Sequence, residues 1–227
     1  MNPTVIITGH SYGLGAALAA AWLETGACVI GLARSNNAAL AATHPGQLHE
    51  TAIDLADPPA VLAYTRSDAF RHICQEADTL WLFNNAGTVA PSAPLGAQAD
   101  DDITHALNLN ITAPLLLANA TVAHARDRER VRIVHISSGA ARKPYPGWSI
   151  YGASKAALDR HAADAAAEGV RIVSLAPGVV DTAMQAGMRN DAAFPLREQF
   201  AALHADGKLQ SASDTAAQIL ACLLYTS

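Results

Sequence analysis

Six short apolar runs, rich in β-branched residues, alternate along the chain with helix-length segments rich in alanine. The runs lie at 4–8, 28–33, 48–53, 79–83, 131–136 and 170–175, and the helical segments lie near 13–25, 57–76, 100–125, 151–168 and 212–224. The runs are apolar nearly throughout, which is typical of strands buried on both faces. Repeats of strand, helix and strand predict an α/β fold with a parallel sheet and right-handed crossovers.

The chain has 227 residues, of which 51% are hydrophobic and 15% charged, so we expect one domain spanning 1–227. The net charge is −5 and no block of Lys or Arg occurs, which argues against a nucleic-acid partner. No apolar run reaches the length that spans a bilayer. Strand-like sequence begins at residue 4, so we expect no leader peptide. The cysteines, Cys28, Cys74 and Cys222, lack metal-site spacing, and free thiols suit a reducing compartment. We therefore expect a cytoplasmic protein without a membrane or metal partner.

Residues 177–210 break the alternation with two prolines, three glycines and mixed polarity. They follow the run at 170–175, so they leave the carboxyl-terminal edge of the predicted sheet. Open α/β sheets bind ligands at that edge, and insertions there tend to cover the crevice. We expect 177–210 to be a substrate-covering segment.

The turn between the first strand and the first helix reads TGHSYGLG over residues 8–15. Gly9 permits a tight turn. Gly13 and Gly15 let the backbone approach a pyrophosphate at the helix N-terminus, where free N–H groups and the helix dipole favour anions. A glycine-rich turn also occurs at strand–helix junctions that bind no nucleotide, but its place after the first strand favours dinucleotide binding.

Polar residues follow the other predicted strands. Asp54 follows the third strand and is a candidate site residue. Alternatively, Asp54 or Asp57 is the N-cap of the next helix. The motif NNAG ends the fourth strand at 84–87, Ser138 follows the fifth, and APGVVDT follows the sixth at 176–182. Each has an ordinary reading as a turn or cap. Together they fall at the edge where an open α/β sheet binds its ligand, which packing alone does not explain.

Two helical segments carry further candidates. Tyr151 and Lys155 are four residues apart and share one helical face, a pair that elsewhere is often solvated surface. A nearby ammonium favours the phenolate, so we expect Lys155 to lower the pKa of Tyr151 from its ordinary value of about 10. Pro114 has no N–H, so the Asn110 carbonyl loses its partner four residues on and the helix should kink. This is either a packing kink or a carbonyl freed to hold a water in a site.

These motifs in combination resemble the short-chain dehydrogenase/reductase family over essentially the whole chain. The resemblance rests on TGHSYGLG, NNAG, Asn110, Ser138, Tyr151-x-x-x-Lys155 and PGVVDT. Within the family the chain looks like the branch of sepiapterin and benzil reductases, through NNAGTVAP (84–91), PGWSIY (146–151), PGVVDTAMQ (177–185) and GKL (207–209). The resemblance implies a Rossmann-like doubly wound parallel sheet and a homodimer or homotetramer. Relatives continue into a last strand after a helix like 212–224, so we expect that strand to be missing.

The resemblance also implies roles for four residues. Tyr151 would donate a proton to the substrate carbonyl oxygen, and Ser138 would hydrogen-bond the same oxygen. Lys155 would bind the nicotinamide ribose, and the Asn110 carbonyl would anchor a water that links Lys155 to solvent. The implied cofactor contacts are Gly9, Ser11, Tyr12, Gly13, Leu14, Gly15, Arg34, Ser35, Asp54, Leu55, Asn85, Ala86, Gly87, Tyr151, Lys155, Pro177, Gly178, Val180 and Thr182.

The end of the second strand predicts the cofactor. Family members that prefer NAD usually carry an acid there, to hold the ribose hydroxyls. Here Ala33 takes that place and Arg34 follows, which can pair with the 2′-phosphate of NADP(H). Ser35 adds a hydroxyl. Many NADP-dependent relatives instead carry a basic residue at the position of Tyr12. Arg34 is alternatively a solvated strand end, but the pattern favours NADPH.

The substrate pocket is predicted least specifically. Trp148, Val89, Met184 and Met188 would line an apolar pocket, although Trp148 alternatively packs its loop against the core. We expect an NADPH-dependent carbonyl reductase that transfers hydride to a small ketone or dicarbonyl. The alternatives are a non-catalytic NADP(H)-binding regulator on the same fold and an NAD-dependent alcohol dehydrogenase of the same family.

Overall fold

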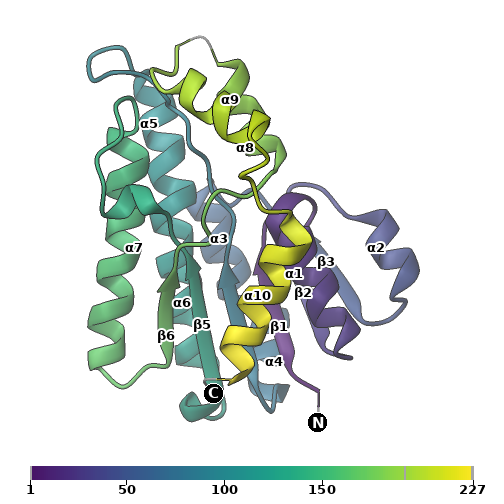
Figure 1. The fold of residues 1–227 in the computed structure, drawn as a ribbon. Coiled ribbons are helices and arrows are strands. Elements are labelled where there is room, and N and C mark those ends of the chain that lie inside the picture. Colours follow the sequence, from purple (N-terminus) through teal and green to yellow (C-terminus); the bar gives the residue numbers. More distant parts are fainter. Residues whose placement is uncertain (1, 192, 226–227) are drawn as a thin grey trace.

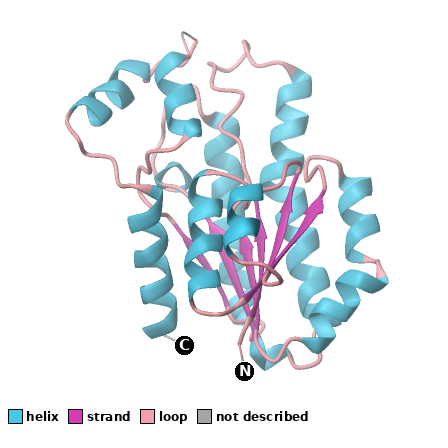
Figure 2. Cartoon of the chain, turned by 90° about the vertical axis from the view of Figure 1, so that its right-hand side faces the viewer, coloured by secondary structure: helices cyan, strands magenta, loops and turns pink. Residues whose placement is uncertain are grey.

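A computed structural model describes residues 2–191 and 193–225. One parallel sheet forms the centre of the molecule, with helices on both faces (Figures 1 and 2). Its order is β3-β2-β1-β4-β5-β6, so the chain builds outward in both directions from β1 and β4. The strands are β1 Thr4–Thr8, β2 Cys28–Ala33, β3 Leu48–Ala52, β4 Leu80–Asn84, β5 Val131–Ile136 and β6 Ile172–Leu175. This confirms the doubly wound Rossmann-like fold, whose ligand crevice lies where the winding direction reverses.

Two apolar layers cover the sheet. On one face, α1 (Gly13–Glu24) and α10 (Ala212–Tyr225) pack against residues such as Val5 and Phe83. On the other face, α3 (Pro58–Thr65), α4 (Asp68–Glu76), α6 (Ala113–His124) and α7 (Ser149–Ala167) contribute to the cluster around Ile6 and Leu82. Successive strand residues therefore enter opposite layers. This double burial explains why β1, β2 and β4 read as continuous apolar runs, whereas the edge strand β3 has no fully buried residue.

The helix predicted over 57–76 is two helices. α3 ends at Thr65 and α4 begins at Asp68, with the Ser67 hydroxyl accepting a hydrogen bond from the Phe70 N–H at 3.1 Å. Ser67 is thus a side-chain N-cap, which starts a new helix axis. A short helix, α2 (Ala38–Thr43), also follows β2, where no helix was predicted.

A long helix runs from Asp100 to His124. It consists of α5 (Asp100–Leu107), a π-helical turn at Asn108–Thr112 and α6. Its most apolar window has a mean hydropathy of 1.3, so by length and composition alone it could cross a membrane. The sequence expectation that no run reaches that length was therefore wrong. Core helices pass the same test, and here Leu117 and Ala118 pack into the sheet layer.

The segment 177–210 forms two helices, α8 (Ala183–Asn190) and α9 (Arg197–Ala205). They lie above the carboxyl ends of the strands (Figure 1). Their buried side chains, Met188 and Phe200, form a separate small cluster with Trp148. α10 ends at Tyr225, the last residue that the structure describes, so the expectation of a missing last strand stays a prediction.

Candidate active site

The glycine loop closes tightly on the start of α1. Gly9 and Gly13 have φ of 69° and 60°, in the left-handed region that favours glycine. A Cβ on Gly15 would lie 2.0 Å from the Gly9 carbonyl oxygen, so only glycine fits there. The N-cap of α1, Tyr12, is exposed and makes no side-chain cap hydrogen bond. The first N–H groups of α1 therefore receive no hydrogen bond from the N-cap side chain, which fits the pyrophosphate of a dinucleotide.

Hydrogen bonds join the glycine loop to the NNAG motif across the point where the winding reverses. The buried Thr8 hydroxyl accepts from the N–H groups of Asn85 and Ala86, both at 2.9 Å. The Asn85 amide donates to the Thr8 carbonyl, also at 2.9 Å. Thr8 was not predicted as a site residue, because a threonine at a strand end carries no signal of its own. Through these hydrogen bonds, Thr8 fixes the position of the NNAG motif relative to the glycine loop.

The remaining predicted cofactor contacts surround this loop. Arg34 is exposed and makes no ion pair within the described residues, and Ser35 donates to Ser11 at 3.2 Å. Leu14 and Leu55 are buried, whereas Asp54 is exposed and accepts from the Ala56 N–H. Beyond β6, Thr182 caps α8, and its methyl lies 3.4 Å from where a Gly13 Cβ would be. The other PGVVDT candidates lie on the same stretch: Pro177, Gly178 with φ of 82°, and Val180, which bridges Gln210.

Asn110 is fully buried at the π-helical turn and anchors the wall of the site. Its side-chain oxygen accepts from the Thr88 N–H, and its amide donates to the Thr88 carbonyl, both at 2.8 Å. The same amide donates to the Ser154 hydroxyl at 3.1 Å. A Cβ on Gly87 would meet both the Asn110 oxygen and the Lys155 ammonium, so Gly87 leaves room where these groups converge. The role of the Asn110 carbonyl in holding a water stays a prediction.

Lys155 is buried inside α7, with 4% of its surface exposed. Its Nζ donates to the Ile136 carbonyl at 2.8 Å and lies 5.7 Å from the centre of the Tyr151 ring. Burial lowers the pKa of Lys155 to about 8, and the charge of Asp159, one turn further along α7, acts in the opposite direction. The ammonium is therefore mostly charged at neutral pH but loses its proton at mildly alkaline pH.

The structure contradicts the expected direction of the Tyr151 pKa. Burial raises the pKa of Tyr151, and a hydrogen bond with Ser138 only partly opposes this. Within the described residues, Lys155 makes no hydrogen bond to the phenol; it lies over the ring and bonds Ile136 instead. Desolvation of the phenolate is therefore the larger effect and sets the direction of the shift. Tyr151 holds its proton firmly and stands beside a second hydroxyl, that of Ser138.

Trp148 packs the covering segment against the site. It is 6% exposed, stacks on Phe194 at 4.9 Å and donates its indole N–H to Ser92. Its ring centre is 5.2 Å from that of Tyr151. Of the two interpretations of Trp148, the structure favours packing. Of the other predicted lining residues, Met188 is buried and Val89 half-buried in the same cluster, whereas Met184 is 42% exposed.

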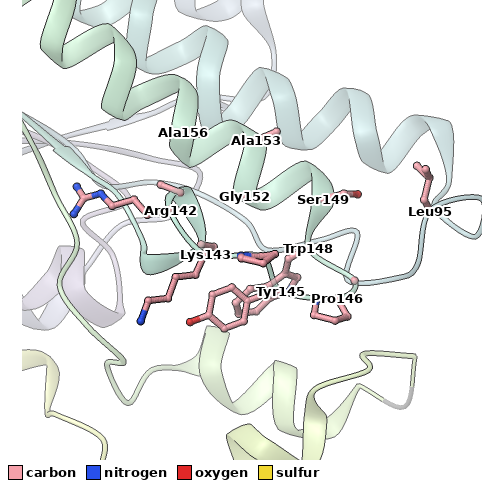
Figure 3. Close-up of a pocket in the computed structure, with 14 residues that line it drawn as sticks. Leu95, Arg142, Lys143, Tyr145, Pro146, Trp148, Ser149, Gly152, Ala153 and Ala156 are labelled. Carbon is pink, nitrogen blue, oxygen red and sulfur yellow. The ribbon is translucent and has the colours of Figure 1, made fainter.

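The pocket shown in Figure 3 lies beside this arrangement. It is lined by the loop 140–148 together with Leu95 and residues of α7: Ser149, Gly152, Ala153 and Ala156. Tyr151 and Lys155 do not line it, because they occupy another face of the same helix. Arg142 on its rim is paired with Asp159 at 3.1 Å. This pocket is therefore distinct from the place where the predicted catalytic residues converge.

The family model for the short chain dehydrogenase matches residues 3–193. The chain belongs to the short-chain dehydrogenase/reductase family. Among characterised relatives, it is 34% identical to benzil reductase ((S)-benzoin forming) of Bacillus cereus, over 91% of this chain and 88% of the relative. It is 32% identical to sepiapterin reductase of Meriones unguiculatus, over 95% of this chain and 88% of the relative. These relatives confirm the branch that the motifs indicated.

Solved structures agree with this assignment. A short-chain dehydrogenase/reductase from Burkholderia vietnamiensis is 43% identical, with a TM-score of 0.76, covering 86% of this chain and 95% of the other. A short-chain dehydrogenase from Sphingobium yanoikuyae in complex with NADPH is 25% identical, with a TM-score of 0.77, covering 96% and 83%. The chain is therefore an oxidoreductase of a family that binds a nicotinamide cofactor.

Proposed function

We propose that this protein is an NADPH-dependent carbonyl reductase that acts on a small ketone or dicarbonyl compound, with Tyr151 as the general acid. The observation that carries the proposal is the convergence of Ser138, Tyr151 and Lys155: Ser138 acts on the pKa of the Tyr151 phenol, and the buried Lys155 ammonium lies 5.7 Å from the centre of the Tyr151 ring. The similarity to benzil and sepiapterin reductases supports a carbonyl substrate.

The arrangement suits proton donation to a carbonyl oxygen. Ser138 lies close enough to Tyr151 to lower the pKa of its phenol, so both hydroxyls can reach a single acceptor oxygen placed between them. The raised pKa of Tyr151 keeps its proton in place until negative charge develops on that oxygen. The Lys155 ammonium then stabilises the phenolate that remains. The bound nicotinamide would supply the hydride, and the covering segment 177–210 would exclude water from the substrate.

The residues present fit NADPH. The Gly9–Gly15 region offers a cradle that a Cβ would fill, and the uncapped start of α1 suits a pyrophosphate. Arg34 follows β2, where a 2′-phosphate would lie, and it makes no ion pair with any residue that the structure describes. Ala33 takes the place of the acid that would repel the phosphate. The NADPH complex of the Sphingobium relative supports the same cofactor.

Replacing Arg34 with aspartate should move cofactor preference from NADPH towards NADH. The change removes a charge-assisted pair, which corresponds to about 1.5–3 kcal/mol, or about tenfold to a hundredfold in affinity for NADPH. Steady-state KM values for both cofactors measure the effect. Arg128→Asp is the matched control, because Arg128 is also exposed but lies in the turn that precedes β5, at the opposite end of the strands. Equal KM values for NADPH and NADH in the parent protein would contradict the assignment.

The rate of carbonyl reduction should fall as pH rises through about 8, because burial lowers the pKa of Lys155 to that value. The charged form, present below this pKa, is the one that stabilises the phenolate, so activity is retained at lower pH and lost above it. A profile of kcat/KM against pH measures this. In Lys155→Arg the side chain stays charged to beyond pH 12, so activity should be lower but the step near pH 8 should disappear. An identical step in both proteins would assign the titration to another group.

A panel of ketones, dicarbonyls, pterins and quinones, assayed by the loss of NADPH absorbance, tests the proposed function. Turnover of a benzil-like or sepiapterin-like compound is the expected result. If the protein binds NADPH but turns over no carbonyl in the panel, it is a non-catalytic regulator on the same fold. Oxidation of alcohols with NAD as the preferred cofactor would instead identify an alcohol dehydrogenase.

A further inference from the structure

A buried acid–base pair joins the glycine loop, through His10, to β3, through Glu50. His10 is completely buried, and the Glu50 side chain is 10% exposed. The Glu50 Oε1 lies 2.7 Å from the His10 Nε2. Burying such groups is costly unless they are paired, and a buried pair contributes little net stability. Neither residue has a role in the proton chemistry described above, so their position requires a different explanation.

The same carboxylate oxygen holds the loop that follows β2. Glu50 Oε1 also accepts a hydrogen bond from the Asn37 N–H at 2.5 Å. Asn37 in turn is the N-cap of α2, with its side chain accepting from the Leu40 N–H. Earlier in this loop, Ser35 donates to Ser11 of the glycine loop. The segment 34–37 is therefore tied to the glycine loop twice, once directly and once through Glu50 and His10.

The position of His10 depends on Gly31 in β2. A Cβ on Gly31 would lie 2.4 Å from the imidazole ring of His10, so the ring packs directly against the Gly31 backbone. Gly31 is also the register partner of Glu50 in β3. The sheet thus places the imidazole and the carboxylate side by side. The sheet therefore sets the position of the Glu50 oxygen that accepts from the Asn37 N–H in the loop after β2.

We propose that Glu50, held by His10, is a positioning residue that fixes segment 34–37 so that Arg34 and Ser35 can receive the 2′-phosphate of NADP(H). The inference rests on the proposed NADPH preference and adds Glu50 and His10 as the residues that position the phosphate-binding segment. Arg34 has no partner of its own in the described structure, so its direction depends on the backbone that carries it. Two tethers reduce the conformational freedom that phosphate binding would otherwise have to remove.

Charge alone would predict the opposite effect. A carboxylate near a 2′-phosphate repels it, so removing the Glu50 charge would strengthen binding if electrostatics dominated. Positioning requires only an acceptor oxygen. Glu50→Gln keeps an acceptor without the charge, whereas Glu50→Ala removes both. The two substitutions therefore separate positioning from charge.

The test uses two probes that differ only in the phosphate, adenosine 2′,5′-bisphosphate and adenosine 5′-monophosphate, with dissociation constants from calorimetry. In Glu50→Ala, the bisphosphate should bind about tenfold more weakly, the effect of losing a hydrogen bond to a charged group. Binding of the monophosphate should be unchanged. Glu50→Gln should recover most of the lost affinity. Glu24→Ala is the matched control, because Glu24 also pairs with a histidine, His44, but lies on the surface; neither probe should respond.

Equal weakening of both probes would show a general structural role and overturn the proposal, as would tighter binding of the bisphosphate in either Glu50 variant. If Glu50→Ala does not fold, Asn37→Pro removes the N–H that Glu50 accepts from and should give the same selective loss. Hydrogen exchange at Asn37 tests the tether without ligand: Glu50→Ala should speed it, and unchanged exchange refutes the tether. A parent protein that binds both probes equally would instead refute the NADPH preference, whatever the exchange shows.

Discussion

Tyr151→Phe should lower the turnover of carbonyl reduction by about 10²- to 10⁴-fold, the usual contribution of a positioned general acid. The substitution removes only the phenolic hydroxyl. The ring that lies beside Trp148 and beneath the Lys155 ammonium is retained. The free energy of unfolding and the affinity for NADPH should therefore be close to those of the parent. Steady-state kinetics measure the loss of turnover. A cofactor titration measures the affinity for NADPH.

Tyr64→Phe is a suitable control for this experiment. Tyr64 is also partly buried, but it lies on α3, where the centre of its ring is 5.3 Å from that of Phe70, away from the predicted site. Its loss of a hydroxyl should leave turnover unchanged. Parental activity in Tyr151→Phe would show that another group supplies the proton.

Gly15→Ala should abolish cofactor binding and destabilise the protein. The new Cβ would lie 2.0 Å from the Gly9 carbonyl oxygen, which is backbone and cannot rotate away. The glycine loop would have to move, and with it the N–H groups that suit the pyrophosphate. Overpacking of this kind lowers the free energy of unfolding by about 1–3 kcal/mol. Chemical denaturation and NADPH titration measure the two effects.

Gly187→Ala provides the matched comparison. Gly187 lies inside α8, and a Cβ there would meet nothing within 4 Å. Because alanine is the better helix former, this variant should be slightly more stable, by about 0.5–1 kcal/mol. If Gly15→Ala behaved like Gly187→Ala, with unchanged NADPH affinity, the glycine loop would not be the pyrophosphate site.

The strands could be predicted because burial on both faces shows as a short apolar run in the local sequence. β1, β2 and β5 match the predicted ranges, and the other three differ by one or two residues at their ends. A strand covered on both faces must be apolar throughout, and no long-range information is needed to see that. By contrast, α2 is only six residues long and contains no buried residue, so it is too short for the periodic apolar pattern that predicts a helix.

The site was predictable only in its motif residues. The convergence of Ser138 and Lys155 on Tyr151 follows from helix spacing and from the common edge of parallel strands. The roles of Thr8 and Glu50 depend on which strands become neighbours and on what register, which single residues do not encode. The direction of the Tyr151 pKa was predicted wrongly, because the degree of burial beneath Trp148 and the covering segment is a tertiary property.

The central claim is that this protein transfers hydride from NADPH to a carbonyl carbon while Tyr151 supplies the proton. It is tested most directly with NADPH deuterated at the transferable position of the nicotinamide and benzil as the proposed substrate, with the product examined by mass spectrometry. The account predicts benzoin that carries deuterium at the new carbinol carbon, formed by the parent protein and nearly absent with Tyr151→Phe. Benzoin without deuterium, or equal product from both proteins, would contradict it.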